Sequence, residues 1–135
     1  MANVWLLKTE PSAYAFADLV REKRTTWDGV KNPLALKHLA NVRRGDLLFV
    51  YHTGDEKAVV GVARAVSEAY ADPKKNEPKL LVVDLEPVRR LANPVTLAAI
   101  KGDRRFAGFD LVRLPRLSVM PVSAAHAAAI EEIAG

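Results

Sequence analysis

Three apolar segments in the middle of the chain constrain its fold most strongly. Leu47–Thr53, Ala58–Val66 and Leu80–Val88 are rich in β-branched and aromatic residues. Thr53-Gly54-Asp55-Glu56 forms a turn between the first two, and a Pro-bounded loop at 73–78 precedes the third. Apolar runs of this length and composition are typical of buried strands. We therefore expect a β-sheet at the centre of the fold.

Helical patterns flank these strands on both sides. Apolar residues recur at near-helical spacing from Tyr14 to Arg24, with Ser12 as the expected N-cap. Asn32-Pro33 begins a second helix that runs to about Val42, because Asn is a good N-cap and Pro fits the first helical position. Two later helices are expected, each preceded by a capping hydroxyl: Leu97–Lys101 after Thr96, and Ala124–Ile133 after Ser123.

Three shorter extended segments complete the pattern. Val4–Lys8 and Thr25–Trp27 come before the central strands, and Leu117–Val122 follows them. Pro121 restricts the last segment to a sheet edge or a strand end, because proline cannot donate to a ladder. Helices at both ends with strands clustered mid-chain predict an α+β fold: a mixed, largely antiparallel and strongly curved or barrel-like sheet with peripheral helices.

Composition indicates one globular domain over residues 1–135. Half of the residues are hydrophobic and 27% are charged, and we find no repeat or linker. No apolar run approaches the roughly 20 residues of a membrane span, so no membrane association is expected. The start, Met1 to Lys8, becomes charged too soon for a secretory signal, which favours a cytoplasmic location. We expect a monomer.

Charge and residue types narrow the chemistry. The net charge of +4 favours an acidic partner such as nucleic acid. Cysteine is absent, which excludes disulfides and thiolate chemistry. The histidines lack metal-ligand spacing, and no cofactor-binding motif occurs, so neither metal nor cofactor is expected. Glu10 and Asp28 could act as an acid/base pair if desolvated, but the stronger interpretation is that both anchor turns through nearby backbone amides.

Aromatic residues beside polar ones offer a binding surface for a nucleobase. A base has a flat π face and a polar edge, so it needs an aromatic platform and a few hydrogen-bonding groups. Trp27 abuts Asp28-Gly29, and Tyr51 abuts His52; on composition alone each is as consistent with a binding site as with the core. For Trp5 and Tyr70 we favour core packing.

Five segments in order resemble the motifs of the EVE-domain family. Together they cover nearly the whole chain: Trp5-Leu6-Leu7-Lys8-Thr9-Glu10-Pro11-Ser12, Trp27-Asp28-Gly29-Val30-Lys31-Asn32, Phe49-Val50-Tyr51-His52-Thr53, Val60-Gly61-Val62-Ala63 with Tyr70-Ala71-Asp72-Pro73, and Leu111 to Val119. Each motif alone is weak, but five in sequence order are highly specific.

The resemblance implies a PUA-like fold, in which a curved mixed sheet or pseudo-barrel is flanked by helices, related to the YTH readers of methylated adenine. It also implies a non-catalytic module that recognises a modified base in DNA or RNA. The pocket would be built from the residues that match the motifs: Lys8, Ser12, Trp27, Gly29, Asn32, Tyr51, His52, Leu117 and Ser118.

Two other functions are alternatives. A nucleic-acid-processing enzyme would use Glu10 or Asp28 and would need a carboxylate of raised pKa inside a cleft. A protein-interaction scaffold with a vestigial pocket would show an apolar surface patch in place of a polar pocket.

Overall fold

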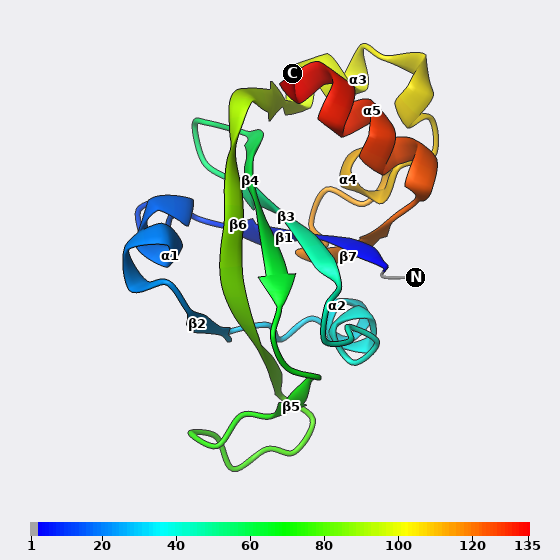
Figure 1. The fold of residues 1–135 in the computed structure, drawn as a ribbon. Coiled ribbons are helices and arrows are strands. Elements are labelled where there is room, and N and C mark those ends of the chain that lie inside the picture. The colour runs from blue at the N-terminus through cyan, green and yellow to red at the C-terminus, as the bar shows by residue number, and fades with distance from the viewer. Residues whose placement is uncertain (1–2) are drawn as a thin grey trace.

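A computed structural model describes residues 3–135 of the chain. Met1 and Ala2 lie outside the described residues. They are the first two residues of the segment Met1 to Lys8, which we judged too quickly charged for a secretory signal. Six strands follow one another in a curled sheet in the order β2-β6-β4-β3-β1-β7, and a short strand, β5, pairs with β6 (Figure 1). Their bounds are β1 Val4–Thr9, β2 Thr25–Trp27, β3 Leu47–His52, β4 Ala58–Ala65, β5 Tyr70–Ala71, β6 Leu81–Thr96 and β7 Val119–Val122.

The sheet is mixed because β1 pairs in parallel with β3 while the other pairs are antiparallel. Parallel neighbours need a long crossover, and α1, β2 and α2 supply it between these two strands. Both strands are nearly continuous apolar runs, since Leu6 and Leu7 of β1 and Leu48 to Tyr51 of β3 are buried. Such runs suit strands that are covered on both faces.

The sheet is curled into a half-barrel flanked by helices, which confirms the predicted fold class. Within the described chain, β2 and β7 form the two ends of the strand path and do not pair with each other. Pro121 lies in β7, so the prediction of an edge strand is confirmed, although β7 begins two residues later than expected. Figure 1 shows α3 and α5 near one end of β6, whereas β5 and the loop after it extend from the opposite end.

Helix α1 begins later than the sequence pattern predicted. It spans Phe16–Glu22, and Ser12 is not its cap. The Asp18 carboxylate instead accepts from the Ala15 backbone N–H at 2.8 Å, which satisfies one of the open donors at this end. The other helices agree more closely with expectation: α2 Pro33–Leu39, α3 Leu97–Lys101 and α5 Ala124–Ala134, with a 3₁₀ turn at Arg104–Phe106 and a short α4 at Asp110–Arg113 that the sequence did not predict.

Strand β6 spans 16 residues, whereas the segment predicted for it spans nine. It continues past Val88 to Thr96 and includes two prolines, Pro87 and Pro94. Proline fits here because the pairing with β4 is irregular. The register shifts between Val62 and Ala63, next to the pair Ala63–Pro87, and again between Val59 and Gly61. The long strand therefore bends around the core.

Gly61 of β4 leaves the space that the Phe16 ring occupies in the core. Phe16 is fully buried at the start of α1. A methyl group at Gly61 would lie 2.5 Å from the Phe16 Cζ atom, closer than non-bonded carbon atoms can approach. The packing of α1 on the sheet therefore requires glycine at this position.

We predict that Gly61→Ala lowers the free energy of unfolding by about 1–3 kcal/mol, because the added methyl group overpacks the core against Phe16. Chemical denaturation measures this change. Gly102→Ala is the matched control, since its methyl group would meet nothing nearer than the Ala98 carbonyl oxygen at 3.5 Å. Equal losses of stability in both variants would contradict the packing argument.

Candidate nucleic-acid interface

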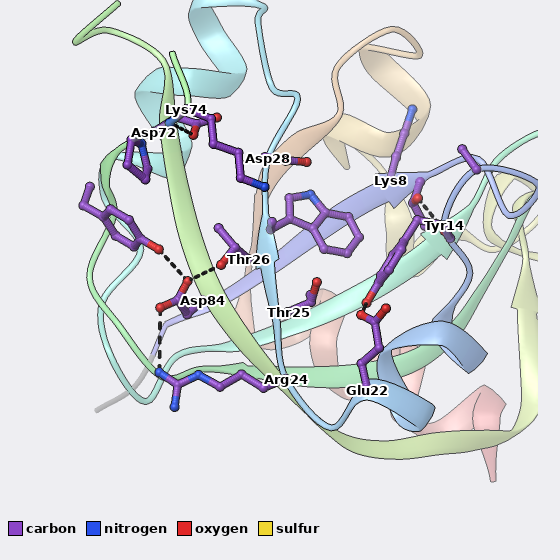
Figure 2. Close-up of a pocket in the computed structure, with 15 residues that line it drawn as sticks. Lys8, Tyr14, Glu22, Arg24, Thr25, Thr26, Asp28, Asp72, Lys74 and Asp84 are labelled. Atoms are coloured by element: carbon purple, nitrogen blue, oxygen red, sulfur yellow. Dashed lines mark hydrogen bonds and ion pairs between the residues drawn. The ribbon is translucent and has the colours of Figure 1, made fainter. Parts of the chain in front are cut away.

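One cavity of about 920 Å³ opens between the end of β1, strand β2 and the segment that follows β5 (Figure 2). This volume lies in the range of about 300–1,000 Å³ that is typical of small-molecule sites. Its walls combine aromatic, hydroxyl and charged side chains: Lys8, Thr9, Ala13, Tyr14, Glu22, Arg24, Thr25, Thr26, Trp27, Asp28, Tyr70, Asp72, Pro73, Lys74 and Asp84.

Trp27 and Tyr14 form the aromatic part of this cavity. Trp27 ends β2 and is 8% exposed, so most of its indole belongs to the core. The Tyr14 ring meets it edge-on, with 6.1 Å between centroids and 87° between planes. The Tyr14 hydroxyl donates to Glu22 Oε1 at 2.7 Å (Figure 2). Burial, together with this carboxylate, raises the pKa of Tyr14 to about 12, so the hydroxyl keeps its proton at neutral pH.

A second group of polar side chains surrounds Asp84 on β6. Its Oδ1 atom accepts from the Thr26 hydroxyl at 2.9 Å and from the Tyr70 hydroxyl at 2.7 Å. The Arg24 guanidinium lies 3.7 Å from Oδ2 (Figure 2). These contacts tie β2 and the region of β5 to β6, and they hold this wall in place.

Lys8, at the end of β1, joins the cavity to the C-terminal part of the chain. Its ammonium donates to the Pro115 carbonyl oxygen at 2.8 Å and lies 5.7 Å from the centre of the Tyr51 ring. Its backbone N–H donates to the Ser118 carbonyl oxygen at 2.9 Å. Burial lowers the pKa of the Lys8 ammonium. Lys8 therefore fixes the 115–118 segment beside β1.

Two of the nine residues predicted to bind the ligand, Lys8 and Trp27, line the cavity. Three others lie in exposed turns near it. The Ser12 hydroxyl donates to Glu10 Oε1 at 3.1 Å. Asn32 caps α2, since its Oδ1 atom accepts from the N–H groups of Leu34 and Ala35. Gly29 has a left-handed backbone conformation with φ of 80°. As ligand contacts, these three stay predictions.

The remaining four predicted residues pack away from the cavity. Tyr51 is 4% exposed, and Leu117 is equally buried. His52 uses both ring nitrogens: Nε2 accepts from the Phe16 N–H at 3.0 Å, so Nδ1 carries the hydrogen and donates to Glu56 at 2.7 Å. Ser118 contributes its carbonyl to Lys8. A direct role for these side chains in binding stays a prediction.

The sequence reasoning missed most of the cavity wall. Tyr70 was expected in the core, but it is 38% exposed and lines the cavity, so that interpretation is wrong. The matched motif Tyr70-Ala71-Asp72-Pro73 could have indicated this part of the wall, since three of its four residues line the cavity. No sequence signal pointed to Glu22, Arg24 or Asp84. Asp84 reaches the cavity through the pairing of β2 with β6, whereas Glu22 ends α1 and Arg24 directly precedes β2.

The two candidate acid/base residues do not form a pair. Glu10 lies outside the cavity, and hydrogen bonds from the Ser12 backbone and hydroxyl hold its pKa below the usual range, opposite to the shift that the enzyme alternative requires. Asp28 lines the cavity, yet within residues 3–135 its carboxylate accepts no hydrogen bond, so it does not anchor a turn as expected.

Residues 3–135 contain no cluster of three or more histidine or carboxylate side chains suited to a metal ion. None of their helices is long and apolar enough to cross a membrane.

The fold and sequence were compared with known proteins. Thymocyte nuclear protein 1 of Rattus norvegicus is 30% identical over 91% of this chain and 70% of its own length. Among solved structures, Rpa0253 of Rhodopseudomonas palustris is 38% identical with a TM-score of 0.94, covering 99% of this chain and 94% of its own. Human THYN1, solved in complex with DNA that contains 5-methylcytosine, is 25% identical with a TM-score of 0.91, covering 98% of each chain.

The family model for the EVE domain matches residues 3–133, which is almost the whole sequence. This match agrees with the resemblance of the five motifs and with the curled, helix-flanked sheet. The chain belongs to the EVE-domain family.

Proposed function

We propose that this protein is a non-catalytic module that holds one modified base of a nucleic acid in the cavity beside Trp27. The observation that carries the proposal is the composition of the cavity wall. Trp27 and Tyr14 supply aromatic surface, and hydroxyl, carboxylate and ammonium groups surround them. A base that leaves its stack is read by hydrogen bonds to its polar edge and by contact with aromatic or apolar side chains.

The relatives support nucleic acid as the partner. Human THYN1 shares the fold and was solved with 5-methylcytosine DNA. DNA with 5-methylcytosine is therefore the first ligand to test, with other modified bases and RNA as further arms. A cavity of about 920 Å³ lies at the upper end of the range for small-molecule sites, so it can hold a base together with its sugar.

The distribution of charge supports contact with phosphate. In residues 3–135 each ion pair with a carboxylate uses arginine or histidine. Lys31, Lys37 and Arg116 are exposed and form no such pair. Lys74 lines the cavity, also without an ion pair. These side chains can meet a polyanion without breaking an internal contact.

The scaffold alternative fits the surface less well. It requires a continuous apolar patch, but the large hydrophobic residues that are exposed come from four different elements: Val20 of α1, Leu34 of α2, Tyr70 of β5 and Val88 of β6. Single exposed apolar residues of this kind are normal on a soluble surface.

We predict that Trp27→Leu weakens binding to a 5-methylcytosine oligonucleotide by about 10- to 100-fold, because an aromatic contact with a base contributes about 1–3 kcal/mol. Leucine keeps apolar volume in the core, and thermal unfolding checks that the variant is folded. Fluorescence anisotropy with a panel of single modified bases, in DNA and RNA form, measures the affinity. A folded variant with unchanged affinity would remove Trp27 from the site.

Affinity is expected to fall steeply with salt, because bound phosphates release counterions. Lys74→Ala should reduce the slope of log K against log salt by about 0.7 on a single strand. Lys101→Ala is the matched control. Lys101 belongs to α3, which lies near the end of β6 opposite to β5 and the loop that contains Lys74 (Figure 1). A wild-type affinity that is flat from low to moderate salt would contradict phosphate contact.

Purified protein should leave a modified oligonucleotide chemically unchanged, because the two candidate acid/base residues do not meet: Asp28 lines the cavity and Glu10 lies outside it. Mass spectrometry of the oligonucleotide after prolonged incubation measures this. Base release or strand cleavage that is lost in Glu10→Gln or Asp28→Asn would contradict the non-catalytic function.

A further inference from the structure

Three cationic side chains line the cavity, and they differ in how they are engaged within the protein. The Arg24 guanidinium lies 3.7 Å from the Asp84 carboxylate, so a neighbouring charge balances it. Lys8 and Lys74 form no ion pair with a carboxylate anywhere in residues 3–135. The cavity therefore presents two ammonium groups that the described chain leaves without a carboxylate partner.

Both ammonium groups keep most of their hydrogen-bonding capacity, since an ammonium carries three N–H donors. Lys8 uses one of them on the Pro115 carbonyl oxygen at 2.8 Å. Lys74 donates its backbone N–H to Asp72 at 2.9 Å, and its exposed ammonium makes no hydrogen bond within the described residues. Burial lowers the pKa of Lys8, and an anion bound beside its ammonium would offset that cost.

The two lysines come from different walls of the cavity. Lys8 belongs to β1, whereas Lys74 lies in the segment that follows β5. In Figure 2 they lie on either side of Thr26 and Asp28, the neighbours of Trp27 in the sequence. A nucleotide whose base contacts Trp27 would therefore have an ammonium group on each of two sides.

A nucleotide within a strand carries a phosphate on each side of its sugar, whereas a terminal nucleotide carries one and a nucleoside none. Four carboxylates also line the cavity, and they disfavour a phosphate except beside an unpaired cation: Glu22, Asp28, Asp72 and Asp84. On the basis of the proposed function, we infer that Lys8 and Lys74 hold the two phosphates that flank the bound base. The module then favours a nucleotide within a strand over a terminal or free one.

Methylphosphonate linkages test this inference, because each one replaces a charged phosphate of an oligonucleotide with a neutral group. The single strands to compare carry one 5-methylcytosine, or the modified base that binds most tightly in the panel. The neutral linkage lies directly 5′ of that base, directly 3′ of it, or several nucleotides away as the control. At low salt, we expect each adjacent neutral linkage to weaken wild-type binding by about 5- to 10-fold relative to the control strand.

Lys8→Met and Lys74→Met assign the two phosphates, since methionine keeps an unbranched side chain and removes the charge. Each variant should bind the strand with one of the two adjacent neutral linkages to within about twofold of the control strand. Each should keep the full effect of the other linkage, and the two variants should differ in which linkage that is. Lys101→Met, in α3 and outside this cavity, is the matched variant that should keep both effects. A variant that is merely less stable binds all strands more weakly by the same factor.

The outcomes separate this inference from the proposed function. Saturable wild-type binding that responds to only one adjacent linkage, or to neither, overturns the inference while the base pocket stands. The inference also fails if both variants become insensitive to the same linkage, or if either variant keeps both effects. Binding to no modified base of the panel contradicts the inference and the proposed function together.

Discussion

The buried carboxylate of Asp46 is the interaction on which the rest of the structure depends. It lies just before β3 and accepts three hydrogen bonds: from the Asn3 N–H at 3.0 Å, the Trp5 indole at 2.9 Å and the Arg43 N–H at 2.9 Å. A buried carboxylate is costly unless such donors satisfy it. The three bonds therefore lock the start of β1 to the connection between α2 and β3 and favour a single register for the parallel pair.

That register determines where the cavity forms. With Val4 opposite Leu47, the far end of β1 places Lys8 beside Tyr51 and Thr9 beside His52. The chain then leaves the sheet, and the Thr9 hydroxyl donates to the Tyr14 carbonyl at 2.6 Å. His52 fixes the start of α1 through the Phe16 N–H. These contacts hold the Tyr14 ring edge-on against Trp27. Tyr51 and His52 thus support the cavity without lining it.

The sequence predicted the fold better than the wall of the cavity, and the reason is physical. Strands and caps leave local patterns: Asn32-Pro33 and Thr96 mark helix starts that the structure contains. The cavity wall depends on tertiary pairing instead. Asp84 reaches it because β6 pairs with β2, and no local pattern records that neighbour. The continuation of β6 past Val88 was missed for the same reason, since it depends on irregular pairing with β4.

The matched motifs contain both residues that line the cavity and residues that pack in the core. Trp27 and Lys8 lie in matched motifs and line the cavity, whereas His52 and Leu117 serve the core. A motif preserves packing and function together, so its buried members cannot be separated from its binding members without coordinates.

The most direct test of the central claim uses the two tryptophans as reporters in one experiment. The chain has two indole N–H groups: that of Trp5 is bonded to buried Asp46, and the other belongs to Trp27, which lines the cavity. A ¹H–¹⁵N spectrum should therefore show two indole signals, assigned by Trp→Phe substitution. On titration with a 5-methylcytosine oligonucleotide, the Trp27 signal should shift strongly and the Trp5 signal should hardly move. Saturable binding that leaves the Trp27 signal in place would contradict a base pocket beside Trp27.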